Sequence, residues 1–194
     1  MQGNFIHETA LIEEKVTIGH FVSIGHSTTV GDNSRIEDGA RVYNDCFIGN
    51  NCIIGANAVL RPRTRLGDNS IFGTLSCSEG DNIVGNFTTI HAQCHITKGV
   101  SIGDNCFIAP FFIATNTPVI TDGRHGVSPS DYKFVKTSIE NDVRIGANVR
   151  LTPGLTIGAF SVIDQDTFLT KDVPPHSHVR GGKDKIGVVV GEAR

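Results

Sequence analysis

A large apolar residue recurs at every sixth position of this chain, and this period constrains the fold more than any other feature. From Ile6 the column runs in steps of six to Ile108, and Ser78 is its one exception. A second column of small residues lies four positions later, with a gap at position 82, and glycine often follows the large residue. Amphipathic helices space apolar residues by three and four, so the period excludes a helical fold. It predicts repeated short strands with sharp corners between them.

The period is interrupted once along the chain. It stops after Ala114 and resumes at Ile139, one residue out of phase, before running on in steps of six to Leu169. Residues 115–138 carry no core pattern and are rich in Pro, Gly, Asp and Ser. We expect an excursion loop there, and long loops in compact folds often carry function. The paired prolines at 174–175 end the repeat, which divides the chain into a repeat domain (1–173) and a C-terminal tail (174–194).

Composition narrows the classes of function and compartment. Seventeen Lys and Arg against 20 Asp and Glu give a net charge of −3, which argues against a nucleic-acid partner. No apolar run approaches 18 residues, so we expect no membrane insertion. The start of the sequence shows no secretory signal pattern. Five cysteines without metal-type spacing indicate reduced thiols and a cytoplasmic protein.

The two columns resemble the repeat of the hexapeptide-repeat acyltransferase family, over about residues 6–173. The resemblance implies an all-β fold, a left-handed parallel β-helix of about eight triangular coils with three hexads in each. It also implies a homotrimer whose active sites lie between subunits. The interior of such a β-helix is filled by the repeat residues, so any site must lie on its outside, where the excursion loop helps to close it.

A closer resemblance lies in residues 90–116. Lys98-Gly99, Pro110 and Thr115-Asn116 stand as in the amino-sugar-nucleotide N-acetyltransferases of the family. The sugar O-acetyltransferase branch continues with Thr-His-Pro, whereas this chain has Asn116-Thr117-Pro118. The resemblance thus implies acetyl transfer from acetyl-CoA to a sugar, with the amine of a nucleotide-linked amino sugar as acceptor, for surface polysaccharide synthesis. A sugar O-acetyltransferase is the first alternative.

Acetyl transfer requires a group that takes the proton of the acceptor, and histidine suits this role near neutral pH. His125 lies between glycines inside the excursion loop, which makes it the first catalytic candidate, and His91 on the repeat is the second. Around them we expect Gln93, His95 and Asn116 to bind the substrate.

The late repeats supply the expected cofactor site. Residues 171–175, Lys-Asp-Val-Pro-Pro, resemble the family segment along which coenzyme A lies, and basic side chains near it suit the phosphates. The residues expected to bind the cofactor are Gly146, Ala147, Pro153, Lys171, Arg180 and Lys183.

Two other functions remain as alternatives for this fold class. A γ-type carbonic anhydrase needs three histidines around a metal, for which His91 and His95 would require His125 as the third. We expect no metal. A non-catalytic β-helix scaffold would bind no coenzyme A. Most cysteines fall in the inward column of small residues, and only Cys77 takes an outward position.

Overall fold

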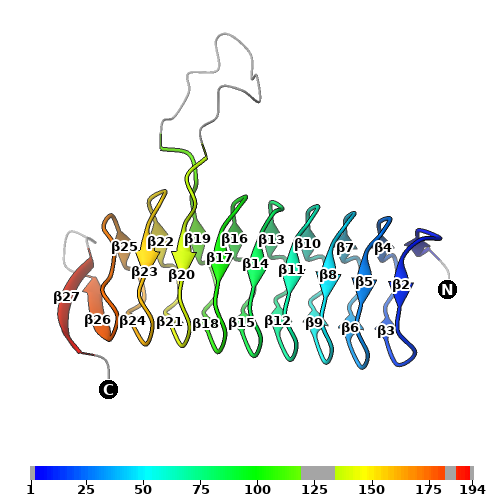
Figure 1. The fold of residues 1–194 in the computed structure, drawn as a ribbon, viewed down its shortest axis with the longest axis horizontal. Helices are drawn as coiled ribbons and strands as arrows, with labels where there is room; N and C mark the ends of the chain where they lie inside the picture. Colours follow the sequence, from blue (N-terminus) through cyan, green and yellow to red (C-terminus); the bar gives the residue numbers. More distant parts are fainter. Residues whose placement is uncertain (1–2, 119–133, 182–186, 193–194) are drawn as a thin grey trace, which may run out of the picture.

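The computed structural model describes residues 3–118, 134–181 and 187–192 of the 194-residue chain. Every element in these ranges is a β-strand, and the strands stack into three sheets that wind around one long axis (Figure 1). The structure is thus the all-β parallel solenoid that the repeat predicts, and it is consistent with a left-handed β-helix.

From β1 to β25 the strands are two residues long and belong to the three sheets in strict rotation. Sheet A contains β1 (Phe5–Ile6), β4 (Ser23–Ile24), β7 (Arg41–Val42), β10 (Val59–Leu60), β13 (Cys77–Ser78), β16 (His95–Ile96), β19 (Ile113–Ala114), β22 (Arg150–Leu151) and β25 (Phe168–Leu169). Sheet B contains β2 (Leu11–Ile12), β5 (Thr29–Val30), β8 (Phe47–Ile48), β11 (Arg65–Leu66), β14 (Ile83–Val84), β17 (Ser101–Ile102), β20 (Ser138–Ile139) and β23 (Thr156–Ile157). Sheet C contains β3 (Thr17–Ile18), β6 (Arg35–Ile36), β9 (Ile53–Ile54), β12 (Ile71–Phe72), β15 (Thr89–Ile90), β18 (Phe107–Ile108), β21 (Arg144–Ile145), β24 (Val162–Ile163), β26 (Ser177–Gly181) and β27 (Gly187–Glu192).

The chain makes about nine coils, one more than the sequence predicts. Sheet A alone has nine strands, and residues 18 apart pair in parallel register, as Val59 does with Cys77. Across the excursion the register spans 37 residues, from Ser101 to Ser138, and the strand rotation continues without a gap. The loop therefore replaces a corner of the solenoid and not one of its coils.

The large column fills the interior, and its single exception has a structural explanation. Ser78 is fully buried like its apolar neighbours, and its hydroxyl donates to Asn82 Oδ1 at 2.7 Å. Thr64 Oγ1 lies 2.7 Å from the same hydroxyl, and Asn82 Nδ2 donates to the Thr97 carbonyl at 2.7 Å. Polar groups buried in this way are stable only when they are hydrogen-bonded. The missing apolar residue therefore marks a buried polar network behind one corner.

Glycines at the corners serve close packing between coils. Gly73 follows the buried Phe72, and a Cβ built on it would lie 2.4 Å from the backbone of His91 in the next coil. The left-handed backbone of the corners falls mostly on other residues, often Asn or Asp, such as Asn51 with φ 55°, and on a few glycines that do not follow the large residue, such as Gly39 with φ 70°. The glycines that follow the large residue are thus required by the close approach of the next coil more than by the backbone conformation of the turn.

One edge of the solenoid carries a ladder of polar side chains. Between sheets B and C, each Oδ1 of the ladder accepts the backbone N–H one coil earlier, for example Asp104 N–H donating to Asn141 at 2.9 Å. Its members are Asp32, Asn50, Asp68, Asn86, Asp104 and Asn141. The ladder satisfies corner amides that the sheets leave unpaired.

Sheet C continues past the last hexad. Strand β26 pairs in parallel with β24, and β27 then pairs with β26 in antiparallel register. The segment after residue 173 thus adds a hairpin to the end of the solenoid (Figure 1). In the described ranges no helix is long and apolar enough to cross a membrane.

Candidate functional site

The excursion loop leaves sheet A after β19 and rejoins sheet B at β20 (Figure 1). We call the row of corners between these two sheets the loop edge. Near the loop it comprises residues 61–64, 79–82, 97–100, 115–118, 134–137, 152–155 and 170–172. Charged and polar side chains of successive coils meet along this row, which makes it the candidate site.

Three charged residues of consecutive corners form a chain of ion pairs on the loop edge. The Asp81 carboxylate accepts hydrogen bonds from Arg63, whose Nη2 lies at 3.0 Å, and pairs with Lys98 Nζ at 3.1 Å. The hydrogen bond from Arg63 lowers the pKa of Asp81, with a smaller contribution from Lys98 in the same direction. The Lys98 ammonium also lies 6.0 Å from the ring centroid of Phe134, at the returning end of the loop. These contacts hold two cations in place next to the loop.

A histidine–carboxylate pair lies beside this chain of charges. His95 points outward from β16, and its Nε2 lies 3.0 Å from Glu79 Oε1. Both side chains are partly exposed, at 43% and 35%, so solvent and ligands reach the pair. Cys77 is in register with His95 on the neighbouring strand β13 and shares its outward face. The carboxylate restricts how the imidazole turns, and thus fixes which ring nitrogen faces outward.

Asn116 lies at the base of the loop, and only 4% of it is exposed. Its Nδ2 donates to the Lys98 carbonyl at 3.0 Å, and its Oδ1 accepts from Thr117 Oγ1 at 3.1 Å. Its backbone carbonyl accepts from Val135 N–H at 3.0 Å, which joins the two ends of the loop. The amide predicted to bind substrate therefore also builds the base of the loop.

The other coil residues predicted for the acceptor lie on a different edge. His91 and Gln93 belong to the corner between sheets C and A, so sheet A separates them from the loop edge. The His91 ring packs edge-on against Phe107 with 4.9 Å between centroids, and Gln93 is exposed with φ 59°. Within one chain, the structure brings His95 and Asn116 close to the loop, and it places His91 and Gln93 on the far side of sheet A.

The residues predicted for the cofactor also divide between two edges. Gly146 and Ala147 lie in the corner between sheets C and A, whereas Pro153 and Lys171 continue the loop edge toward the C-terminal end. Lys171 is exposed.

Three further predicted residues belong to the loop or the C-terminal end. Arg180 is exposed on β26, and its Nε pairs with Asp164 Oδ2 at 3.4 Å. His125 and Lys183 lie outside the described residues.

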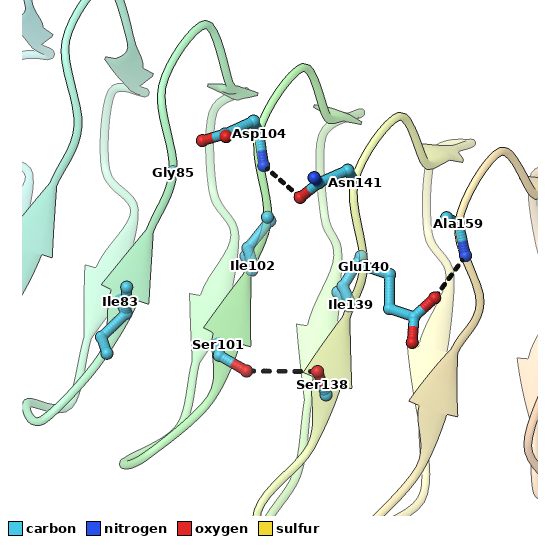
Figure 2. Close-up of a pocket in the computed structure, with 11 residues that line it drawn as sticks. Ile83, Gly85, Ser101, Ile102, Asp104, Ser138, Ile139, Glu140, Asn141 and Ala159 are labelled. Atoms are coloured by element: carbon cyan, nitrogen blue, oxygen red, sulfur yellow. Dashed lines mark hydrogen bonds between the residues drawn. The ribbon is translucent and has the colours of Figure 1, made fainter.

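A shallow groove of about 500 Å³ lies on the face of sheet B, where the chain returns from the loop (Figure 2). Ser101 Oγ donates to Ser138 Oγ across it at 3.3 Å, and Glu140 accepts the Ala159 N–H at 2.8 Å. Asp104 is the second acidic residue of the lining, which contains no cationic side chain. The groove therefore suits neutral hydroxyl-bearing groups better than phosphates.

Four cysteines point inward, as the sequence predicts, and behave as small core residues. Burial raises the pKa of the Cys46 thiol to about 11, and it also raises the pKa values of the other three. These residues are Cys46, Cys52, Cys94 and Cys106. Cys77 is partly exposed, but its pKa is also raised, so no described cysteine has the lowered pKa of a reactive nucleophile.

Metal-ligating side chains do not converge within the ranges that the structure describes. No group of three or more His, Cys, Asp or Glu residues there is arranged to hold a metal ion. His95 instead pairs with Glu79, and His91 packs on an aromatic ring.

Sequence reasoning missed the charged partners of the loop edge. Arg63 and Asp81 are 18 residues apart, and Lys98 and Glu79 occupy neighbouring corners of the same row. Arranging the sequence in rows of 18 would have placed these charges in three adjacent columns beside the loop. The pairing of His95 with Glu79, 16 residues apart, would have appeared in the same table.

The fold and this edge define a class of protein, a parallel β-helix built from hexapeptides with its polar site outside the coil. Family comparisons agree with it. The model described as "Bacterial transferase hexapeptide (six repeats)" matches residues 9–44, 45–76 and 83–111, and "Hexapeptide repeat of succinyl-transferase" matches residues 136–171. The chain belongs to the bacterial transferase hexapeptide family.

Individual relatives extend this comparison. Galactoside O-acetyltransferase of Escherichia coli (strain K12) is 43% identical over 79 residues, covering 40% of this chain and 37% of that protein. Chloramphenicol acetyltransferase of Agrobacterium fabrum (strain C58 / ATCC 33970) is 36% identical over 106 residues, or 53% of this chain and 49% of the relative. The chain thus matches less than half the length of these curated relatives.

A solved structure of galactoside acetyltransferase in complex with coenzyme A superposes with a TM-score of 0.58 at 28% identity, covering 68% of this chain and 65% of that chain. UDP-N-acetylglucosamine acyltransferase from Campylobacter jejuni superposes over 96% of this chain and 74% of that chain, with a TM-score of 0.70. At 19% identity this second likeness concerns the fold alone.

Proposed function

We propose that this protein transfers an acetyl group from acetyl-CoA to a sugar at the loop edge. The observation that carries the proposal is the position of the excursion loop. It interrupts the solenoid at the edge where His95, Glu79 and Lys98 meet. The relatives named above are acetyltransferases, and one structure of 28% identity was solved in complex with coenzyme A, which supports the donor.

The reaction needs a held thioester, a proton acceptor and donors for the oxyanion of the tetrahedral intermediate. Pro153 and Lys171 continue the loop edge beyond the loop, and we assign the donor to that side, with the Lys171 ammonium toward a phosphate. The acceptor sugar then lies on the other side, against His95 and Glu79, whose ring nitrogen and carboxylate suit hydroxyl and amine groups.

His125 is the proposed proton acceptor, because the loop that carries it starts and ends at this edge. His91 is the second catalytic candidate. It lies across sheet A from the loop edge of its own chain, so it would act at a loop supplied by another subunit. Phe107, which contacts His91, and Ile113, in register with His95, are exposed and apolar, which supports the proposed homotrimer.

For the acceptor we propose the amine of a nucleotide-linked amino sugar, as the residues around Lys98 and Asn116 imply. A sugar hydroxyl is the second candidate, because a relative of 43% identity is a galactoside O-acetyltransferase. The two acceptors differ in their need for a general base on the protein. An amine can lose its proton before it attacks, whereas a hydroxyl needs the base during the reaction.

The proposal is tested by calorimetric titration with coenzyme A, followed by acetyl-transfer assays on matched amino-sugar nucleotides and neutral sugars. We expect saturable binding of coenzyme A and acetylation of the amino-sugar nucleotide. Absence of coenzyme A binding would favour a scaffold. Bound zinc together with carbon dioxide hydration would favour the carbonic anhydrase alternative.

A further inference from the structure

Arginines gather where the loop edge extends toward the N-terminal end. Arg61 and Arg63 lie in one corner, Arg65 begins the next strand, β11, and Arg41 stands on β7, the strand beside β10. All four arginines are exposed. In a chain with a net charge of −3, this concentration of cations within two coils is unusual.

These arginines are engaged to different degrees. Asp81 accepts hydrogen bonds from Arg63, and the Arg65 guanidinium lies 4.8 Å from the ring centroid of Phe47. Arg41 and Arg61 make no ion pair with any residue that the structure describes. Arg61 directly follows β10, and its backbone N–H donates to the Ser78 carbonyl at 3.0 Å, which places this residue at the start of its corner of the loop edge.

The acidic side chains nearby are already matched with other cations or histidines. Glu79 lies against His95, Asp81 is shared by Arg63 and Lys98, and Asp45 lies 3.8 Å from His26. The guanidinium groups of Arg41 and Arg61, which pair with no acidic side chain in the described ranges, therefore keep donors that can bind an anion from solution.

We propose that Arg61, together with Arg41, binds the phosphate groups of the acceptor substrate, so that the acceptor is an anionic, nucleotide-linked sugar. This inference rests on the proposed function, because it assigns a role in the same reaction. A planar guanidinium pairs with phosphate through two parallel hydrogen bonds, and Arg41 on the adjacent strand supplies a second fork.

Spacing along the solenoid supports this assignment. The corner of Arg61 lies two coils before the corner of Lys98, and strands of neighbouring coils are about 4.7–4.9 Å apart, which gives roughly 10 Å. One sugar ring and its linkage to a phosphate span about this distance. Lys171 lies on the opposite side of the loop along the same edge. Donor and acceptor phosphates would then bind at opposite ends, with the reacting groups beneath the loop.

The test measures UDP binding to the full-length protein by calorimetry, at low and moderate salt, with coenzyme A titrated separately. The variants are Arg61→Gln and Arg41→Gln, which keep length and polarity. Arg144→Gln on sheet C is the matched control, since Arg144 is also exposed and makes no ion pair within the described ranges. We expect at least fivefold weaker UDP binding for each test variant, a weaker salt dependence, and coenzyme A affinity within twofold of wild type.

Several results would overturn the proposal. They are UDP affinity within twofold of wild type in Arg61→Gln, an equal loss in Arg144→Gln, no UDP binding by the wild type at millimolar concentration, or a loss confined to coenzyme A. The last result would move the arginines to the donor site. If UDP binds as expected but no acetyl transfer occurs, the anion site stands and the proposed function fails. Thermal unfolding of each variant confirms that the fold is intact.

Discussion

Four of the five thiols are packed inside the solenoid, and their burial couples the stability of the fold to alkaline pH. The Cys46 thiol ionises near its ordinary pKa of 9.0 in the unfolded chain but only near about 11 in the folded one. Unfolding therefore releases a proton between these values, and the folded state loses stability as pH rises from 9 to 11.

We predict that the free energy of unfolding falls over this range, by up to about 2–3 kcal/mol from Cys46 alone. Cys46→Ala should flatten the fall. Urea unfolding at pH 8, 9, 10 and 11 measures it, and an unchanged pH slope in the variant would show that this thiol does not contribute.

The proposed base gives a second prediction for a single residue. His125→Ala should lower kcat at least tenfold, because general base catalysis contributes about 10²–10⁴ in rate. The trimer and coenzyme A binding should be unchanged. His20→Ala serves as the control, since His20 lies on an early coil where its ring faces Asp38. Near wild-type kcat in His125→Ala, with a loss in His91→Ala or His95→Ala, would place the base on the coil.

At the scale of the elements, the corner formed by residues 79–82 is stabilised by one buried side-chain amide. Asn82 is fully buried, its Oδ1 accepts from Ser78 and from Gly80 N–H, and its Nδ2 donates to two carbonyls. Asn82→Ala would remove these four hydrogen bonds between buried groups, although Ser78 would keep its contact with Thr64. We predict a loss of about 2–4 kcal/mol in unfolding free energy, measured by urea denaturation. Exposed Glu14→Ala should change it by less than about 0.5 kcal/mol. A similar small effect for Asn82→Ala would mean that the corner rearranges.

Most of the elements could be predicted from the sequence alone. Because every hexad contributes inward residues to one narrow core, the period of six predicted the strands, the inward thiols and the position of the loop. The count of eight coils was one too low, and the hairpin of β26 and β27 lies outside the repeat pattern. The partners of the candidate site escaped prediction because their pairing depends on side chains from different coils. Glu79 and His95 carry no local motif, and only their stacking joins them.

At the scale of the whole molecule, assembly is the central expectation. Exposed Phe107 on sheet C packs against His91, and exposed Ile113 lies on the outer face of sheet A in register with His95. Such apolar side chains favour association, and a neighbouring loop edge would complete a site there. We predict a sedimentation mass of three chains of 20.8 kDa each at micromolar concentration. A mass of one chain under these conditions would contradict the trimer and the shared site.

The replacement of a corner by the loop, with no coil lost, has a consequence for substrate choice. Corners along the loop edge are separated by whole coils. The number of coils therefore sets the distance between the proposed phosphate site near Arg61 and the proposed reaction site near Lys98. Removing or duplicating 18 residues between them would keep the strand register of the remaining coils and change that length by about 4.7–4.9 Å. We therefore expect that a variant of this chain with one added coil would accept a longer acceptor, without a change at either end of the site.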